Sequence, residues 1–151
     1  MAKHRHGGVV PLKELDDFEL ADYEPDVRGW EVLSADGATI GKVEELLADP
    51  SVRKVRYLDV ELEEEIARDE RHVLIPIGAA RLHEKDDRVY VNDLDARAVS
   101  TLPRYQGGPV DPDYEQRVHG GFGVPPASAD RPYEHRIFDD REFYDSRAHR
   151  L

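Results

Sequence analysis

The sequence contains no cysteine, which excludes disulfides, thiolate metal sites and cysteine nucleophiles. It also lacks any apolar run near the roughly 20 residues that a membrane-spanning helix needs. The basic leader at residues 1–8 is followed by no apolar stretch of signal-peptide length. These absences predict a cytoplasmic chain that does not insert into membranes.

Positive charge is scarce relative to negative charge. The formal net charge is −12, and charged residues make up 36 % of the chain. A surface this acidic repels phosphate backbones, so we expect no nucleic acid as a partner.

Aliphatic side chains are scarce in the C-terminal third. Leu, Ile and Val cluster between Val9 and Leu102, and only five of them follow Pro103. Because hydrophobic residues make up only 39 % of the chain, a core requires such a concentration. We therefore predict a flexible leader at 1–8, one domain at 9–103 and a tail at 104–151.

Alternating apolar and polar residues predict short strands in the domain. Residues 29–33 read as a strand, and Asp36-Gly37 after them favours a hairpin turn because glycine accepts positive φ. Further strands are predicted from the alternation or apolar runs at residues 58–62, 72–77, 80–83 and 88–91. Asp95 is placed to cap one short helix that ends at Pro103.

Residues 39–48 are ambiguous by periodicity. Ile40, Val43, Leu46 and Leu47 have helical spacing, whereas the preceding turn and Gly41 favour a strand. A β-bulge would reconcile the two, since one extra residue resets the alternation.

Five blocks of sequence occur in a characteristic order. They read DVRGWEV (26–32), DGATIGKVEELLAD (36–49), RYLDV (56–60), HVLIPI (72–77) and DRVYV (87–91). Together these blocks resemble the PRC-barrel domain family, over about residues 9–103. They are most similar to the cytoplasmic domain of the photosynthetic reaction-centre H subunit and its free-standing bacterial relatives.

The resemblance implies a small, largely antiparallel β-barrel in which residues 39–48 form a strand. In the reaction centre this domain caps the cytoplasmic face and shapes proton delivery to a quinone, and in the ribosome maturation factor it helps to bind a ribosomal protein. Both are docking roles rather than enzyme activities. The H subunit's membrane helix and the maturation factor's preceding β-domain have no counterpart here, so we expect a stand-alone bacterial member.

No catalytic residue, metal ligand or cofactor site is predicted. The seven histidines form no i, i+4 pair, the serines lie in no Gly-x-Ser-x-Gly motif, and glycines 120–123 lack the Lys-Ser/Thr of a phosphate loop. His72 is interpreted as a strand-edge residue, and acidic runs such as 63–65 as solvated loop. The alternatives are a surface proton-relay path, by analogy with the H subunit, and a small hydrolase using clustered acids.

Three glycines and one tryptophan stand out as structural. Gly29, Gly37 and Gly41 fall where a tight barrel needs positive φ or close backbone approach. Trp30, the single tryptophan, is expected in the core or at the barrel rim, with a binding hot spot as the alternative.

The tail is rich in Pro and Gly but carries aromatics that pure disorder would lack. We expect it to be an extended segment that is partly ordered, packing on its own barrel, on a partner or on nothing. The proposed anchors are Tyr105, Tyr114, Phe122, Tyr133, Phe138 and Tyr144.

From the family blocks and the aromatic tail, the sequence predicts a non-catalytic interaction or scaffold module. It would self-associate as a homo-oligomer or dock on a larger complex, and the partner is unknown. The alternative is a role like that of the H subunit in photosynthetic electron and proton transfer, which rests on analogy alone.

Overall fold

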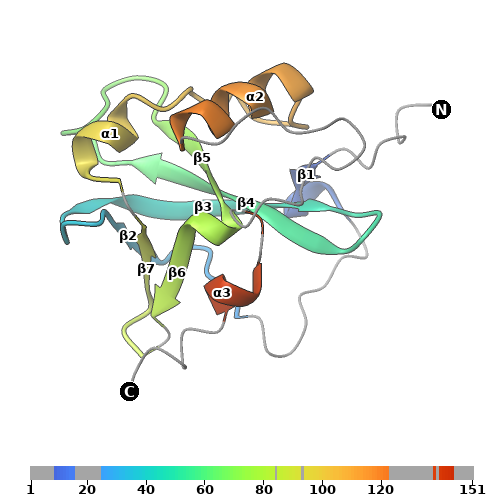
Figure 1. Cartoon of the computed structure of the whole chain (residues 1–151), viewed down its shortest axis with the longest axis horizontal. Coiled ribbons are helices and arrows are strands. Elements are labelled where there is room, and N and C mark those ends of the chain that lie inside the picture. The colour runs from blue at the N-terminus through green and yellow to red at the C-terminus, as the bar shows by residue number, and fades with distance from the viewer. Residues whose placement is uncertain are drawn as a thin grey trace.

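The computed structural model of the chain, shown in Figure 1, describes residues 9–15, 25–83, 85–92, 94–122, 138 and 140–144. Its centre is a seven-stranded sheet in the order β5-β4-β3-β2-β7-β6, with β1 paired to β3. The strands are β1 (Val10–Pro11), β2 (Glu31–Leu33), β3 (Thr39–Asp49), β4 (Lys54–Leu62), β5 (His72–Pro76), β6 (Ala80–His83) and β7 (Arg88–Val91). All pairings are antiparallel except that of β2 with β7.

The sheet curls around one main core. Each strand from β2 to β7 contributes buried residues to one main hydrophobic cluster, which includes Val32, Leu58, Ile75, Leu82 and Val89. Strands that share one core in this way must bend toward each other. The predicted small, mainly β barrel is confirmed.

The ambiguous segment is the long strand β3. Its pairing with β4 shifts register between Val43 and Glu45 and again between Leu47 and Ala48. The first shift places an extra residue, Glu44, in β3 and resets its alternation, which contributes to the helix-like spacing of its apolar positions. The second shift places an extra residue in β4. The sequence prediction of a strand with a bulge is confirmed.

Two of the predicted turn and cap features are also confirmed. Gly37 has φ +88° in the β2–β3 turn, where its N–H donates to the carbonyl of Ser34 at 2.9 Å. Asp95 caps the short helix α1 (Ala96–Ser100) by accepting from the Ala98 N–H at 2.9 Å.

The sheet is buried on both faces at its centre. Leu46 and Leu58 point into the main core, whereas their neighbours Leu47 and Tyr57 join Leu74 in a second cluster on the opposite face. Helix α2 (Pro112–Gly121) and Phe138 cover this second face, and Figure 1 shows α2 next to β5. A two-sided core explains why β3 and β4 are so continuously apolar.

The C-terminal stretch differs from the extended tail that the sequence predicted. Asp111 caps α2 by accepting from the Tyr114 N–H at 2.8 Å, and Pro112 occupies the first helical position. A further short helix, α3 (Asp140–Tyr144), places Phe143 and Tyr144 in the main core. The described part of the tail therefore packs on its own barrel.

Short 3₁₀ turns complete the fold: η2 (Leu12–Glu14) follows β1, and η3 (Ile77–Ala79) connects β5 to β6. Of the helices in the described residues, none has the length and apolarity needed to cross a membrane. The predicted leader at 1–8 lies outside the described residues.

Candidate functional site

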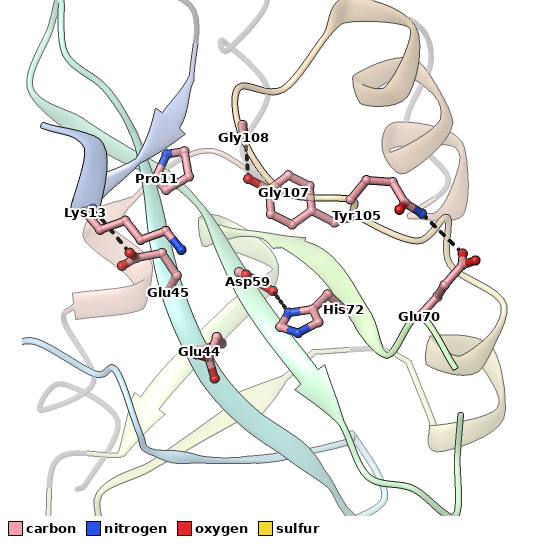
Figure 2. Close-up of a pocket in the computed structure, with 11 residues that line it drawn as sticks. Pro11, Lys13, Glu44, Glu45, Asp59, Glu70, His72, Tyr105, Gly107 and Gly108 are labelled. Atoms are coloured by element: carbon pink, nitrogen blue, oxygen red, sulfur yellow. Dashed lines mark hydrogen bonds and ion pairs between the residues drawn. The ribbon is translucent and has the colours of Figure 1, made fainter. Parts of the chain in front are cut away.

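A polar pocket of about 400 Å³ opens beside the sheet, where η2, β3, β4, the start of β5 and the loop 105–108 meet (Figure 2). Its charged and polar side chains are Lys13, Glu44, Glu45, Asp59, Glu70, His72 and Gln106. Pro11, Tyr105 and two glycines complete the lining. The pocket is thus dominated by carboxylates.

The bulge in β3 brings several of these acids together. The register shift at Val43/Glu45 leaves Glu44 exposed and turns Glu45 inward, opposite Asp59 of β4. Asp59 pairs with Leu74 of β5, so His72, two residues earlier, is its diagonal neighbour. The sheet register therefore places an imidazole within reach of a buried carboxylate.

Asp59 and His72 form an ion-pair contact at the floor of the pocket. His72 Nδ1 lies 2.8 Å from Asp59 Oδ1, and the Asp59 side chain is only 8 % exposed. Burial raises the pKa of Asp59 above its usual value, the His72 hydrogen bond opposes that rise, and the charges of Glu44 and Glu45 add to it. The hydrogen bond from His72 therefore does not fully replace the water contacts that the Asp59 carboxylate loses on burial.

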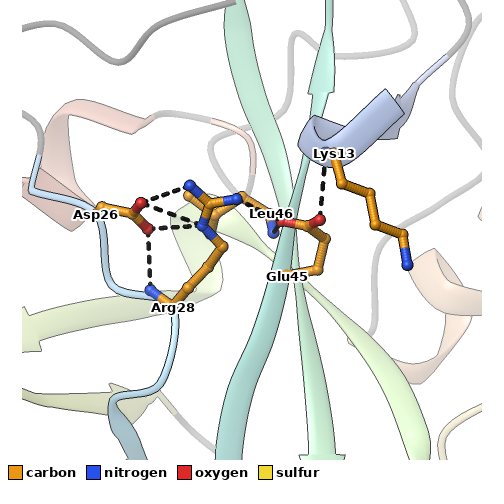
Figure 3. A network of polar contacts seen from close by, with 5 residues as sticks. All are labelled: Lys13, Asp26, Arg28, Glu45 and Leu46. Carbon is orange, nitrogen blue, oxygen red and sulfur yellow. Dashed lines mark hydrogen bonds and ion pairs between the residues drawn. The ribbon is translucent and has the colours of Figure 1, made fainter. Parts of the chain in front are cut away.

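The buried carboxylate of Glu45 has more hydrogen-bond donors than that of Asp59 (Figure 3). Its carboxylate accepts from Arg28 Nη1 at 3.2 Å and from the backbone N–H groups of Lys13 at 3.2 Å and Leu46 at 2.9 Å. Arg28 is itself held by Asp26, whose pKa is lowered by that side-chain hydrogen bond. This network fixes η2 against β3 and makes one wall of the pocket rigid.

The opposite wall is the loop after Pro103. The Tyr105 N–H donates to the His72 carbonyl at 2.8 Å, and its hydroxyl donates to the Gly108 carbonyl. Gly107 and Gly108 both have positive φ, which lets the loop turn tightly at the rim. Burial raises the pKa of Tyr105, so this hydroxyl stays protonated and engaged.

The three glycines proposed from the sequence occupy turns and a close approach. Gly29 has φ +92° and Gly37 φ +88°. At Gly41, a Cβ would lie 2.1 Å from the carbonyl oxygen of Glu61 on β4. None of the three lines the pocket.

Most of the proposed aromatic anchors are buried within the chain itself. Tyr105 and Tyr114 belong to the second cluster, with the Tyr114 hydroxyl 2.8 Å from the Pro103 carbonyl. Phe138 packs edge-on against Tyr57, and Tyr144 lies in the main core. Within the chain, intramolecular apolar contacts already use the surface of these four side chains.

The remaining aromatics are less deeply placed. Trp30 is half-buried and packs on the main core, which agrees with its expected place at the barrel rim. Phe122 is half-buried and touches both clusters. Tyr133 lies outside the described residues.

The pocket was not predicted from the sequence. His72 was interpreted as a strand-edge residue, and Asp59 was covered only by the predicted strand at 58–62. The available signal was the pair Glu44-Glu45, two consecutive acids at the bulge, next to the apolar residues Leu46 and Leu47. Over the part of the chain that the structure describes, no three His, Asp or Glu side chains are grouped to hold a metal ion.

The PRC-barrel domain family model matches residues 21–97, just over half of the chain. The match spans β2 to β7, and with them Glu44, Glu45, Asp59 and His72. The walls of the pocket formed by η2 and by the loop 105–108 lie outside it. The resemblance of the five sequence blocks is confirmed, and the chain belongs to the PRC-barrel domain family.

Proposed function

We propose that this protein is a non-catalytic docking module that attaches reversibly to a larger protein complex. The PRC-barrel domain is a small domain of the protein-interaction and scaffold type. The finer proposal, that this chain docks through charged contacts, comes from its surface.

The observation that carries the proposal is the polarity of that surface. Among the described residues, Val52 is the single large hydrophobic side chain that is exposed, and the formal net charge is −12. Obligate interfaces resemble a core cut in half, whereas reversible ones are polar at the rim and guided by charge. Copies of so acidic a chain also repel each other, which favours a basic partner over self-association.

The pocket chemistry is consistent with binding rather than catalysis. Glu45 is held by three donors, and the Tyr105 hydroxyl, the one hydroxyl among the described lining residues, is engaged by a carbonyl. A nucleophile must instead be free to attack and be activated by an adjacent base. Recognition of charge needs only fixed carboxylates.

Cross-linking of the full chain in native lysate, membranes included, would identify a partner. The purified partner is then titrated against the full chain at low and at high salt. We expect a saturable complex whose dissociation constant rises about tenfold or more at high salt, because screening weakens exposed charge pairs. A chain that cross-links to nothing, or a complex that salt does not weaken, would contradict docking through charge.

A second candidate is proton transfer at a photosynthetic reaction centre, as expected from the H subunit. The observation that favours it is the Asp59–His72 contact, which joins a buried carboxylate to an imidazole that is 35 % exposed. Added to reaction-centre membranes, the full chain would then accelerate proton uptake, and Asp59→Asn would remove the effect. A source organism without reaction centres eliminates this candidate.

A further inference from the structure

We propose that the pocket between η2 and the loop 105–108 binds an arginine side chain presented by the docking partner, with the guanidinium group over Asp59. The proposal rests on the docking function and names the chemistry of the partner at the point of contact. It assigns a specific role to a pocket that the family match only partly covers.

The charge of the pocket selects a cation. Four carboxylates line it, against the ammonium of Lys13 and the imidazole of His72. Arg28 neutralises Glu45, but Glu70 contacts only the neutral amide of Gln106, at 3.2 Å. Within the described residues Glu44 makes no ion pair, so the rim keeps uncompensated negative charge.

Asp59 is the independent feature that points to a ligand. A carboxylate can accept about four hydrogen bonds, yet within the described residues His72 is the single donor to Asp59. Its side chain is only 8 % exposed, and Figure 2 shows it beside the His72 ring, among the residues that line the pocket. A guanidinium group that enters the pocket would supply the missing donors in a paired, charge-assisted geometry.

The apolar side of the pocket favours arginine over a smaller cation. The rings of Pro11 and Tyr105 border one side of it (Figure 2). A planar, weakly hydrated guanidinium group loses less hydration in a pocket with such an apolar border than a compact, strongly hydrated ammonium does. A volume of about 400 Å³ accommodates the arginine head and the end of its stem.

The test is a titration of the isotopically labelled full chain, followed by NMR, with N-acetyl-arginine methylamide. The matched control ligand is the citrulline analogue, which has nearly the same shape and no charge. We expect saturable amide shifts at Asp59, His72, Gly107 and Gly108, with a dissociation constant on the order of millimolar for the arginine ligand. Equal shifts with citrulline, or shifts spread over the acidic surface without saturation, would overturn the proposal.

Two sets of variants separate the pocket from general acidity. The double variant Glu44→Gln/Glu70→Gln changes exposed rim residues, and Glu63→Gln/Glu64→Gln makes the same charge change in an exposed loop away from the pocket lining. We expect the rim variant to weaken arginine binding about fivefold or more and the loop variant to change it less than twofold. Equal effects of the two variants would refute a specific site.

Asp59→Asn is expected to abolish arginine binding. If this buried variant does not fold, the exposed rim variant still decides the question. The outcome is also separable from the docking function: a chain that binds its purified partner but not the arginine ligand docks through another surface, and only the arginine proposal then fails.

Discussion

Replacing Gly41 with alanine tests the barrel that positions the pocket. Gly41 lies in β3 opposite Leu62 of β4. An added Cβ would lie 2.1 Å from the carbonyl oxygen of Glu61 and 2.9 Å from its carbonyl carbon. Both are backbone atoms, so β3 and β4 would have to separate by about 1 Å to restore a normal contact distance.

The expected cost of Gly41→Ala lies at the upper end for overpacked cores. Overpacking costs about 1–3 kcal/mol and occasionally more, and here rigid backbone rather than a flexible side chain must move. We expect a loss of about 3 kcal/mol in the free energy of unfolding, or roughly 6–12 °C in Tm. Urea unfolding followed by the fluorescence of Trp30, the single tryptophan, measures it.

Gly120→Ala is the matched control. Gly120 lies in α2, where a Cβ would meet nothing within 4 Å. Alanine is the better helix former, so this change is expected to raise stability by about 0.5–1 kcal/mol. If Gly41→Ala unfolds within about 0.5 kcal/mol of the unchanged protein, the close pairing of β3 and β4 at this residue is refuted.

Three further predictions concern the tail and the pocket. Phe143→Ala should lose about 3–5 kcal/mol in thermal unfolding, because the ring is fully buried in the main core; a loss below about 1 kcal/mol would show that α3 does not pack there. Asp111→Ala should cost about 1 kcal/mol through the lost cap of α2, and hydrogen exchange should quicken in residues 112–121; unchanged exchange would contradict the cap. The raised pKa of Asp59 means that the folded state binds more protons than the unfolded state just above pH 3.8. Stability from this group therefore falls as pH rises from 3.8 through the folded-state pKa, and Asp59→Asn should remove that fall in urea titrations; an identical pH profile in the variant would contradict the assignment.

The barrel could be predicted because its signals are local. Alternation at 58–62 and the turn at Asp36-Gly37 specify strand and hairpin within a few residues. Helix α2 was missed although Asp111-Pro112 is a typical helix start. Its buried residues are only Tyr114, Val118 and His119, so a Gly- and Pro-rich stretch gave too weak a helical period.

The pocket could not be predicted because its walls are distant in sequence. The Lys13 N–H donates to Glu45, which is 32 residues away in the sequence. The Tyr105 N–H donates to the carbonyl of His72 at the start of β5. Asp59 alternates with the apolar residues of β4, which places it on the face opposite the main core. That face is buried only because segments distant in sequence cover it, and no local sequence pattern predicts where those segments lie.

A titration of the purified, cross-linked partner against the full chain tests the docking function most directly. The expected result is a saturable complex that weakens at high salt and that Glu44→Gln/Glu70→Gln weakens more than Glu63→Gln/Glu64→Gln does. The contradicting result is a chain that forms no saturable complex, or one whose affinity changes with neither salt nor the charge of its surface.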